Sequence, residues 1–462
     1  MRILLVVYDN GSYIHYFPQS LSYIAAVLLK AGHDVEIYNQ DKCHYPDEHL
    51  TWYLDREKFD CIGLSVVGGY YQYRKLLKIS EAVCKAKNKP FYIIGGHGPS
   101  PEPEYFLRKT NADAVVMGEG EETVVELVDA VGNKRPLSPV KGVAFREGKK
   151  VVINERRPLI KDIDSIPFPA FHLFPVYYYS LLRMPHAGSS DFLMSAMTGR
   201  GCTYTCTFCY RMDEGFRPRS PENIVDEIRL LKREYGITYI EFCDELVMSS
   251  AERTMRLCEE FLKAELNMKW WANGRLNYAR PDVLKIMKRA GCVFLNYGIE
   301  SMDDQVLKNM NKDLTTDQIV SGVEATIKAG ISPGLNIIFG NIGDDKETLK
   351  KGVNFLLKYD DCTQVRTIRP VTPYPGSQLY YDAIRKGFLK DVEDFYERKH
   401  LNSDLLSVNF TDLSDEEFYA CLLEANTTLV NNYYHKKRAE ALEQLKRLYL
   451  LRDAGFRGFR QT

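Results

Sequence analysis

The chain alternates short apolar runs with stretches of helical length, and this alternation most constrains how it can fold. Over residues 1–130, five of the runs have the length and composition of buried β-strands. The stretches between them are long enough for the right-handed crossovers that join parallel strands. We therefore expect an N-terminal doubly wound, Rossmann-like α/β domain whose ligand lies beyond the carboxyl ends of its strands. The expected strands are Ile3–Tyr8, Val35–Tyr38, Cys61–Val66, Phe91–Ile94 and Ala114–Met117, with helices such as Leu21–Ala31 and Tyr73–Ala86 between them.

The alternation resumes near residue 192 and gives six further strand–helix units. A closed TIM barrel needs about eight units, so these predict a partial (β/α)6 barrel of TIM type with its chemistry at the carboxyl ends of the strands. The expected strands are Phe192–Met197, Tyr239–Cys243, Lys269–Ala272, Val293–Tyr297, Ser332–Phe339 and Gln364–Ile368. The expected helices are Pro221–Glu234, Ala251–Glu265, Pro281–Ala290, Thr316–Ala329, Lys346–Leu357 and Ser377–Lys386.

A connecting segment lies between the two α/β regions. Residues 142–153 predict a hairpin that turns at Arg146-Glu147-Gly148. The prolines and aromatic residues from Pro158 to Tyr179 predict an ordered linker wrapped on the next domain, because a flexible linker would lack those aromatics. We expect an N-terminal domain at residues 1–140, a hairpin and aromatic linker at 141–190, a barrel at 191–386 and a small helical cap at 387–462.

The composition is that of a soluble globular protein. Hydrophobic residues make up 45% and charged residues 27% of the 462 residues, and the net charge is -1, which excludes a disordered chain and a polycationic nucleic-acid binder. No apolar run approaches the ~20 residues of a membrane-spanning helix, and the first run is too short for a signal peptide. Eleven cysteines in such a chain favour a reducing compartment. We expect a cytoplasmic monomer.

Cys202, Cys206 and Cys209 form a C-x3-C-x2-C group directly after the first predicted barrel strand. This spacing lets one loop bring three thiolates to one iron–sulfur cubane. Such clusters normally have four cysteine ligands, so three would leave one iron of a 4Fe-4S cluster open to a substrate or cofactor. The alternatives are a zinc knuckle, which lacks a fourth Cys or His before Cys243, a four-cysteine electron carrier, and unliganded thiols. The other eight cysteines, including Cys43, Cys61, Cys84 and Cys243, are expected to pack in the core.

This cysteine loop, placed after the first strand of a six-unit barrel, resembles the loop of the radical S-adenosylmethionine (SAM) superfamily. The doubly wound domain before it resembles the cobalamin-binding domain of the cobalamin-dependent branch of that superfamily. The resemblance implies a 4Fe-4S cluster, SAM and cobalamin as cofactors, and an external electron donor such as flavodoxin or ferredoxin. Besides the cysteines, it rests on Ser65-Val66-Val67, Gly95-Gly96, Gly118-Glu119-Gly120-Glu121, Gly298-Ile299-Glu300-Ser301, Gly340-Asn341-Ile342-Gly343 and Thr372-Pro373-Tyr374-Pro375-Gly376-Ser377.

In this superfamily the open iron binds the amino and carboxylate groups of SAM, and an electron from the cluster breaks a sulfonium carbon–sulfur bond to give a 5'-deoxyadenosyl radical. The resemblance assigns no catalytic residue beyond those that hold the cofactors. Acidic residues at strand ends also commonly cap helices, which is the competing explanation for the acids among them. The implied SAM site contains Phe208, the two acids Asp244 and Glu245 near the methionyl amino group, Arg275 at the methionyl carboxylate, Glu300 at the ribose, and Ile338, Gly340 and Tyr374 around the adenine.

Glycines at the expected strand ends would let a large flat ligand approach the backbone of the first domain. A nicotinamide or flavin site is the rival, but no G-x-G-x-x-G opens the first helix and no phosphate-binding P-loop motif occurs. The implied cobalamin site contains Asn10, Gly11, Ser12, Ser65, Val67, Gly68, Gly69, Tyr70, Tyr71, Gly95, Gly96, His97, Gly98, Gly118, Glu119 and Gly120, with Ser65 bonding the nucleotide base.

The lower face of the cobalt is expected to lack a histidine ligand. The D-x-H-x-x-G motif that supplies this ligand in some cobalamin-binding relatives is absent, and His15 is offset from the required spacing. Tyr70 or Tyr71 is the expected neighbour of the cobalt, so cobalamin would bind in a histidine-off form. His97 is the only histidine in a predicted ligand loop, and such a residue either bonds within its loop or binds the ligand.

The C-terminal stretch 436–460 holds eight basic and three acidic residues, with Leu442, Leu445, Leu448 and Leu451 at helical spacing. Such a helix would suit an anionic substrate or a membrane surface. An ordinary surface helix that buries its leucines is the interpretation we favour.

Together these features predict a cobalamin-dependent radical enzyme, a methyltransferase acting on an unactivated carbon of a small molecule or lipid. Relatives that use the same cofactors for cyclisation, ring contraction or anaerobic oxidation are the first alternative. A tRNA methylthiotransferase would need three N-terminal cysteines and a β-barrel tail, whereas the first cysteine here is Cys43 and the tail is helical. A cobalamin sensor or carrier would leave the cysteine loop without a purpose. No nucleic-acid partner is expected.

Overall fold

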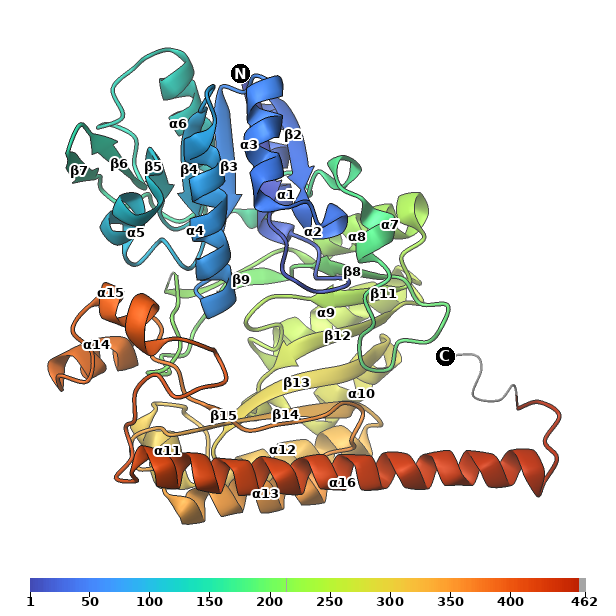
Figure 1. Cartoon of the computed structure of the whole chain (residues 1–462). Coiled ribbons are helices and arrows are strands. Elements are labelled where there is room, and N and C mark those ends of the chain that lie inside the picture. The colour runs from blue at the N-terminus through green and yellow to red at the C-terminus, as the bar shows by residue number, and fades with distance from the viewer. Residues whose placement is uncertain (213, 457–462) are drawn as a thin grey trace.

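The computed structural model describes residues 1–212 and 214–456, which form two mainly parallel β-sheets joined by a linker (Figure 1). The first sheet has the strand order β2-β1-β3-β4-β5-β6-β7, and its first five strands are parallel. The strand order reverses at β1, because β2 is added on one side of it and β3 on the other, and this creates a crevice at the carboxyl edge between β1 and β3. The expected doubly wound domain is confirmed. Its strands are β1 (Arg2–Val7), β2 (Asp34–Asn39), β3 (Cys61–Ser65), β4 (Phe91–Gly95), β5 (Ala114–Val116), β6 (Val143–Glu147) and β7 (Lys150–Ile153).

Helices cover both faces of this sheet, which explains why its inner strands are apolar on both sides. Ile3 and Leu5 of β1 pack in a core shared with α1 and α6, whereas Leu4 and Val6 face the other side, towards α3, α4 and α5. The helices are α1 (Gln19–Lys30), α2 (Gln40–Cys43), α3 (Asp47–Arg56), α4 (Tyr70–Lys85), α5 (Pro103–Thr110) and α6 (Glu121–Gly132).

The hairpin of β6 and β7 extends the first sheet, because β6 pairs antiparallel with β5. The sequence grouped this hairpin with the linker, but its pairing attaches it to the first domain. The linker that follows contains η1 (Ile163–Ser165), η2 (Phe171–Leu173) and α7 (Val176–Tyr179). Its aromatic rings surround Phe17 of the first domain, at centroid distances of 5.4 Å for Phe171, 5.3 Å for Phe174 and 5.6 Å for Tyr179. The linker is therefore ordered, and it packs on the first domain as well as on the next one.

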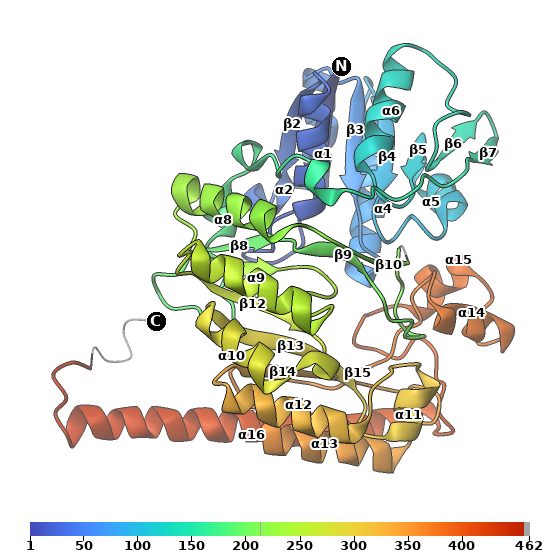
Figure 2. The same cartoon turned by 180° about the vertical axis from the view of Figure 1, so that it is seen from behind.

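The second sheet is a half-barrel of six parallel strands in consecutive order, as predicted (Figure 2). The last strand is β15 (Arg369–Pro370) instead of Gln364–Ile368, because residues 360–366 form a turn in which Arg366 pairs with Asp360 at 2.5 Å. The other strands are β8 (Leu193–Ala196), β11 (Tyr239–Phe242), β12 (Lys269–Gly274), β13 (Cys292–Glu300) and β14 (Ser332–Phe339). The helices are α8 (Pro221–Tyr235), α9 (Ala251–Lys263), η3 (Leu276–Tyr278), α10 (Pro281–Arg289), α11 (Asp304–Asn309), α12 (Thr316–Lys328) and α13 (Lys346–Tyr359).

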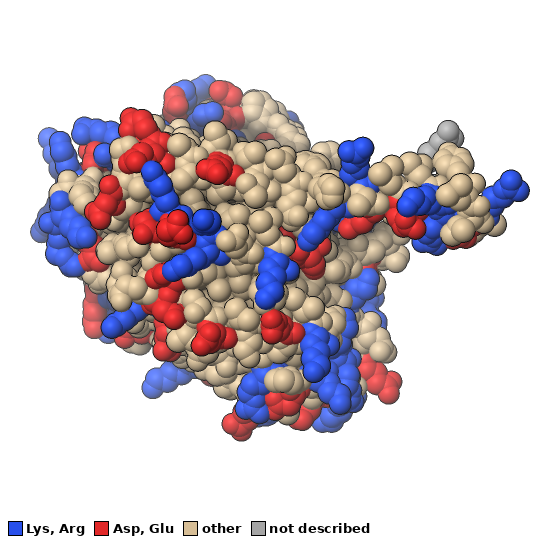
Figure 3. All heavy atoms as spheres, turned by 90° about the horizontal axis from the view of Figure 1, so that it is seen from below, with Lys and Arg blue, Asp and Glu red and all other residues tan. Residues whose placement is uncertain are grey.

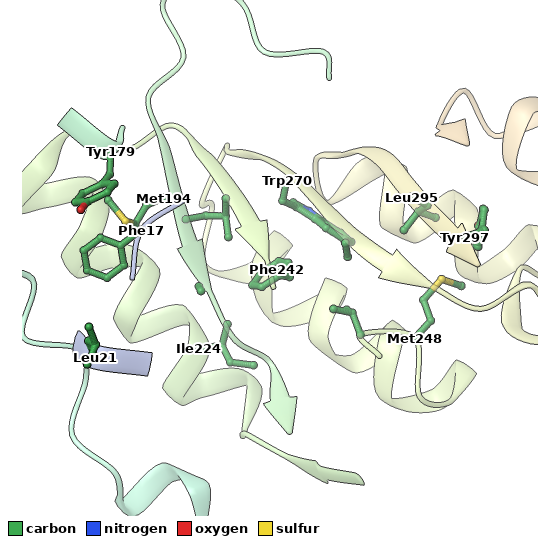
Figure 4. Packing of buried hydrophobic residues seen from close by; sticks show 14 of the residues in the cluster. Phe17, Leu21, Tyr179, Met194, Ile224, Phe242, Met248, Trp270, Leu295 and Tyr297 are labelled. Atoms are coloured by element: carbon green, nitrogen blue, oxygen red, sulfur yellow. The ribbon is translucent and has the colours of Figure 1, made fainter. Parts of the chain in front are cut away.

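The core of the half-barrel is continuous with the core of the first domain. Figure 4 shows Met194, Phe242 and Trp270 of neighbouring strands in one layer, with Phe17 at its edge. The rings of Phe242 and Trp270 meet edge to face at 5.6 Å, a geometry that adds to the burial of both rings. This shared core fixes the two sheets relative to each other.

A two-stranded hairpin that the sequence did not predict lies between β8 and α8. Its strands are β9 (Gly199–Cys202) and β10 (Gly215–Pro218), and the connection between them carries Cys206 and Cys209. The pattern Gly199-Arg200-Gly201-Cys202 has no apolar alternation, so it carries no strand signal.

The C-terminal region is helical, as expected, and its first part contacts the first domain. The ring of Tyr396 stacks on Tyr73 of α4 at 4.5 Å, and Glu397 pairs with Arg74 at 3.1 Å. The elements here are α14 (Gln378–Arg385), α15 (Val392–Asp394) and the π-helical η4 (Phe395–Lys399).

The last helix, α16 (Asp415–Tyr449), packs on α13 through only its first half. Its buried residues end at Leu429, and beyond them Leu442 is 47% and Leu451 is 72% exposed. The prediction that this helix buries its leucines is therefore wrong, because the helix projects past the half-barrel (Figures 1 and 3). Residues 457–460 of the basic stretch lie outside the described residues. Within the described chain, no helix has the length and apolarity needed to cross a membrane.

Candidate active site

A cavity of about 580 Å³ lies between the carboxyl edge of the first sheet and the cysteine hairpin. One wall comes from the loops after β1, β3, β4 and β5, and the other from β9 and the loop after β11. The cavity therefore joins both regions in which the sequence predicts cofactors. Its lining includes Asn10, Ser65, Val67, Gly95, Gly96, His97, Gly118, Glu119 and Gly120 from the first domain, and Cys202, Asp244 and Glu245 from the second.

The cavity continues between the first sheet and the helices α1 and α6, where Leu5, Leu28 and Val128 line it. Two glycines keep this extension open. A Cβ atom on Gly63 would lie 2.8 Å from the Leu5 Cδ2 atom, and one on Gly120 would lie 2.9 Å from the Ile24 Cδ1 atom. The first domain therefore offers a narrow apolar slot below its loops, which fits a ligand with a long tail.

Polar groups at the entrance to this slot lack partners inside the protein. The side-chain nitrogen and oxygen of Gln19 are both buried and make no hydrogen bond within the described residues. The neighbouring Ser20 hydroxyl donates to the Ser65 hydroxyl at 3.2 Å. Leaving a buried amide unpaired costs about 1–3 kcal/mol per group. The orphaned amide fits a ligand that carries both donors and acceptors, as cobalamin does through its amide side chains and its nucleotide tail.

The remaining residues of the implied cobalamin site lie around this cavity but do not line it. The Tyr71 hydroxyl donates to the Asp9 carbonyl at 3.2 Å, and a Cβ on Gly68 would lie 3.5 Å from the Tyr374 ring. His15, which the sequence set aside because of its spacing, does line the cavity. The residues outside the lining are Gly11, Ser12, Gly68, Gly69, Tyr70, Tyr71 and Gly98.

The connection between β9 and β10 is supported from below by the loop after α11. The Thr207 amide donates to the Met310 carbonyl at 2.9 Å, and the Asn311 side chain donates to the Thr205 carbonyl at 3.1 Å. Burial and the neighbouring Cys206 and Cys202 raise the pKa of the Cys209 thiol to about 11. Ionised thiols at this spacing would repel one another. A positive centre among them is therefore needed to hold all three as thiolates.

Within the part of the chain that the structure describes, no three His, Cys, Asp or Glu side chains converge around a single metal ion. A cubane places each thiolate on a different iron, so its three ligands stand farther apart than the ligands of one ion. Three thiols on one loop without a fourth ligand match a cluster with an open iron better than a tetrahedral zinc site. The donor set of Cys202, Cys206 and Cys209 fits the 4Fe-4S cluster.

Asp244 and Glu245, adjacent in sequence after β11, have different surroundings. The Thr198 amide donates to both oxygens of Asp244, at 2.8 and 2.9 Å, and the Thr198 hydroxyl donates to it as well. Burial raises the pKa of Asp244 to about 6. Glu245 is exposed to the cavity, and among the described residues it accepts only from the Gly201 amide, at 3.1 Å. Asp244 thus ties β11 to the end of β8, and Glu245 is the carboxylate that a ligand can reach.

Arg275 is committed to protein groups. It is 8% exposed, its guanidinium lies 3.2 Å from the centre of the Tyr204 ring, and it donates to the Lys312 carbonyl. Glu300 is paired with the Lys312 ammonium at 3.0 Å, and that ammonium lies 5.7 Å from the centre of the Phe208 ring. The structure therefore uses Nε and Nη2 of Arg275 to support the cysteine loop, and its implied bond to a methionyl carboxylate stays a prediction.

The last three residues of the implied SAM site also lie outside the cavity lining. Gly340 is covered by α16, since a Cβ there would lie 2.9 Å from the Phe418 ring. Ile338 is partly buried on the side of the half-barrel that faces the C-terminal region, and Tyr374 meets the ring of Phe395 at 6.0 Å. Their place around an adenine stays a prediction.

Sequence reasoning missed several lining residues. Cys43, Cys84 and Cys243 are exposed, contrary to the expectation that they pack in the core, and Cys243 faces the cavity because it sits where β11 ends. Gln19 and Arg211 also line the cavity. Their only sequence signals are their positions, at the start of the first helix and two residues after Cys209.

Comparisons with known proteins agree with this geometry. A family model described as the radical SAM superfamily matches residues 197–356, and one described as a B12 binding domain matches residues 11–128. An uncharacterized methyltransferase of Pyrococcus horikoshii is 29% identical over 426 residues, which are 88% of this chain and 90% of that protein. An anaerobic magnesium-protoporphyrin IX monomethyl ester cyclase of Rubrivivax gelatinosus is 25% identical over 412 residues, or 86% of this chain and 72% of that protein.

A solved structure shares the fold of nearly the whole chain. It is the radical SAM methyltransferase TsrM from Kitasatospora setae, with cobalamin and a 4Fe-4S cluster bound. It has a TM-score of 0.73 at 16% identity and covers 92% of this chain and 88% of its own. The likeness thus extends over both sheets and the linker between them.

Proposed function

Because the chain belongs to the cobalamin-dependent branch of the radical SAM superfamily, we propose that it is a methyltransferase that adds a methyl group to an unactivated carbon of a small molecule or lipid. The observation that carries the proposal is the single cavity lined by the cobalamin-type loops and by Cys202 and Glu245. Substrate, cobalamin and SAM would meet there without crossing solvent. The methyltransferase name of the relative from P. horikoshii supports the same choice.

Each wall of the cavity would hold one cofactor. The glycines of the first wall and the Gln19 amide would hold cobalamin, and Cys202, Cys206 and Cys209 would hold the 4Fe-4S cluster, with Glu245 beside the amino group of SAM. When bound, these groups supply a transferable methyl and a radical that removes hydrogen from carbon. The chain itself positions them and keeps water and oxygen away, which the buried interface between the two walls is suited to do.

The first methyl transfer can be tested without knowing the substrate. Protein reconstituted anaerobically with the cluster and cob(I)alamin should convert methyl-d3-SAM to S-adenosylhomocysteine once per protein, with the label recovered on cobalamin by mass spectrometry. In this step the methyl group moves as a cation from sulfur to the reduced cobalt, so no further reductant is consumed. Protein that binds both cofactors and leaves the label on SAM contradicts the proposal.

A cyclase or another radical outcome without methyl transfer is the second candidate, favoured by the relative from R. gelatinosus. Such an enzyme would form 5'-deoxyadenosine with its substrate, no S-adenosylhomocysteine and no labelled product. Cytoplasmic location, a monomeric state and a flavodoxin or ferredoxin as electron donor remain part of the proposal. Size-exclusion chromatography and reduction assays with each donor would test the last two.

A further inference from the structure

The cysteine hairpin places two arginines directly opposite each other. Arg200 of β9 and Arg217 of β10 are register partners in the antiparallel pair. Like charges at such positions destabilise the pairing, and a lone two-stranded hairpin is only marginally stable in water. An acidic side chain placed between the two arginines would offset this repulsion.

Glu119 of the first domain provides that side chain. Its Oε1 atom accepts from Arg200 at 2.8 Å and from Arg217 at 2.9 Å, and its Oε2 atom lies 2.9 Å from Arg217. Glu121 takes the other terminal nitrogen of Arg200. The side chains of both arginines are 16% exposed and that of Glu119 is 9% exposed, so the group is largely removed from water. Leaving one of its charges unpaired would cost far more than losing a surface ion pair.

The linker closes the same group from a third side. The Ile160 amide donates to Glu119 Oε2 at 2.8 Å, and Arg217 donates to the Ile160 carbonyl at 2.7 Å. Burial alone would raise the pKa of Glu119, but the hydrogen bonds from Arg217 and Arg200 outweigh it and hold this pKa below its usual range. Glu119 is therefore ionised at neutral pH.

The position of Glu119 connects the two walls of the cavity. It lies between Gly118 and Gly120, which line the cavity on the cobalamin side, while its carboxylate holds the strands whose connection carries the cysteines. We propose that Glu119 is a positioning residue that locks the cysteine hairpin to the cobalamin loop and thereby sets the separation of the two cofactors. The inference rests on the presence of both cofactors and not on whether a methyl group is transferred.

Hydrogen exchange of the protein without cofactors tests the lock. In Glu119→Gln the backbone hydrogens of β9 and β10 should exchange about tenfold faster, because the carboxylate that the two opposed arginines share is then lost. Glu126→Gln is the matched control, since Glu126 lies on α6 and pairs with Arg157 of the linker instead of the hairpin. It should leave the exchange of the hairpin unchanged. Equal exchange in Glu119→Gln and the parent protein would overturn the proposal.

A double variant distinguishes charge balance from general damage. Removing Arg217 together with Glu119, as Glu119→Gln/Arg217→Gln, ends the repulsion and should slow hairpin exchange relative to Glu119→Gln alone. A double variant that exchanges as fast as the single variant, or faster, contradicts the argument from opposed charges.

Electron paramagnetic resonance tests the separation itself. Protein loaded with cob(II)alamin and reduced to give a paramagnetic cluster should show a spin–spin interaction between the two centres. In Glu119→Gln, at equal cobalt and iron content, this interaction should become weaker or broader, whereas Glu126→Gln should match the parent. An unchanged interaction in Glu119→Gln would show that other contacts set the separation, whatever reaction the enzyme catalyses.

Discussion

The two walls of the cavity are built in different ways. The central strands of the first sheet, β1, β3, β4 and β5, contain no acidic residue, and their ends present glycine backbone to the cavity. The half-barrel wall carries the cysteines, and Glu241 and Asp244 lie buried at the end of β11. The first wall faces the cavity with backbone and the Gln19 amide, and its Glu119 carboxylate is turned to the hairpin arginines, whereas the second wall faces the cavity with the Cys202 thiol and the Glu245 carboxylate. A mutation on one wall should therefore affect one cofactor and spare the other.

Removal of a cluster ligand should have the largest effect. Cys206→Ala is expected to abolish the cluster and all turnover, because the two remaining thiols cannot hold a cubane. Affinity for cobalamin should stay within about twofold of the parent, since the other wall is untouched. Iron and sulfide analysis and cobalamin titration measure the two quantities. Cys84→Ser, at an exposed cysteine outside the cavity, is the control and should keep its cluster. Loss of cobalamin binding in Cys206→Ala would contradict the expectation that each wall holds its cofactor independently.

A buried acid makes the half-barrel sensitive to pH. Burial raises the pKa of Glu241 to about 7, and within the described part of the chain its one hydrogen-bond partner is the Ser195 hydroxyl at 2.7 Å. The folded state holds the proton of Glu241 more tightly than the unfolded chain does. The contribution of this proton to the free energy of unfolding is therefore complete below pH 4.5 and is lost as the pH rises to about 7. In Glu241→Gln the free energy of unfolding should lack this decline, which is on the order of 3 kcal/mol.

Denaturant unfolding at a series of pH values measures this difference. Glu234→Gln, at a side chain that is 53% exposed, serves as the control and should keep the pH dependence of the parent. If Glu241→Gln retains the full decline in the free energy of unfolding between pH 4.5 and 7, a group other than Glu241 causes that decline.

On the first wall, Gln19→Leu tests the unpaired amide. Cobalamin should bind about tenfold more weakly, because two hydrogen bonds at the slot are lost. Cobinamide, which lacks the nucleotide tail, should bind to the variant and the parent alike if Gln19 contacts the tail. Gln378→Leu is the matched control, since Gln378 is the first residue of α14 as Gln19 is of α1. An equal loss for both ligands would instead place Gln19 at the corrin ring.

The smallest effect is expected at Glu245. Glu245→Gln should leave the unfolding temperature within about 2 °C of the parent, because the side chain is exposed. SAM should bind to cluster-loaded protein about fivefold more weakly, as for the loss of one partly solvated ion pair. Asp244→Asn should show the reverse pattern, a lower unfolding temperature with less effect on affinity. Anaerobic calorimetry of both variants separates a ligand-facing acid from a structural one.

Both sheets could be predicted because parallel strands covered on two faces are almost continuously apolar. Ile3–Tyr8 is such a run, and it overlaps the observed β1 closely. The hairpin of β9 and β10 gave no signal because its pairing depends on Glu119, which is distant in sequence. The last strand was placed too early because Val365 and Ile368 look like strand residues, whereas Val365 lies within the segment that the Asp360–Arg366 pair closes.

The candidate site likewise contains features that the local sequence predicts and features that depend on residues distant in the chain. Loops after strands were predictable because the carboxyl ends of parallel strands share one edge. Individual contacts were not, as Arg275 shows, since the carbonyl that captures its guanidinium lies on Lys312, 37 residues away. Gln19 was missed because an unpaired amide is visible only once its surroundings are known.

The lock between Glu119 and the hairpin also bears on the order in which the protein assembles during synthesis. Residues 1–132 contain the five parallel strands of the first sheet and their helices, and they leave the ribosome before Arg200 is made. Domains commonly fold in that N-terminal to C-terminal order. The acidic partner is then already in place when the arginines emerge, so the hairpin need not persist unpaired while the half-barrel is still being synthesised. The first domain would in this way serve as a template on which the cysteine loop forms before iron arrives.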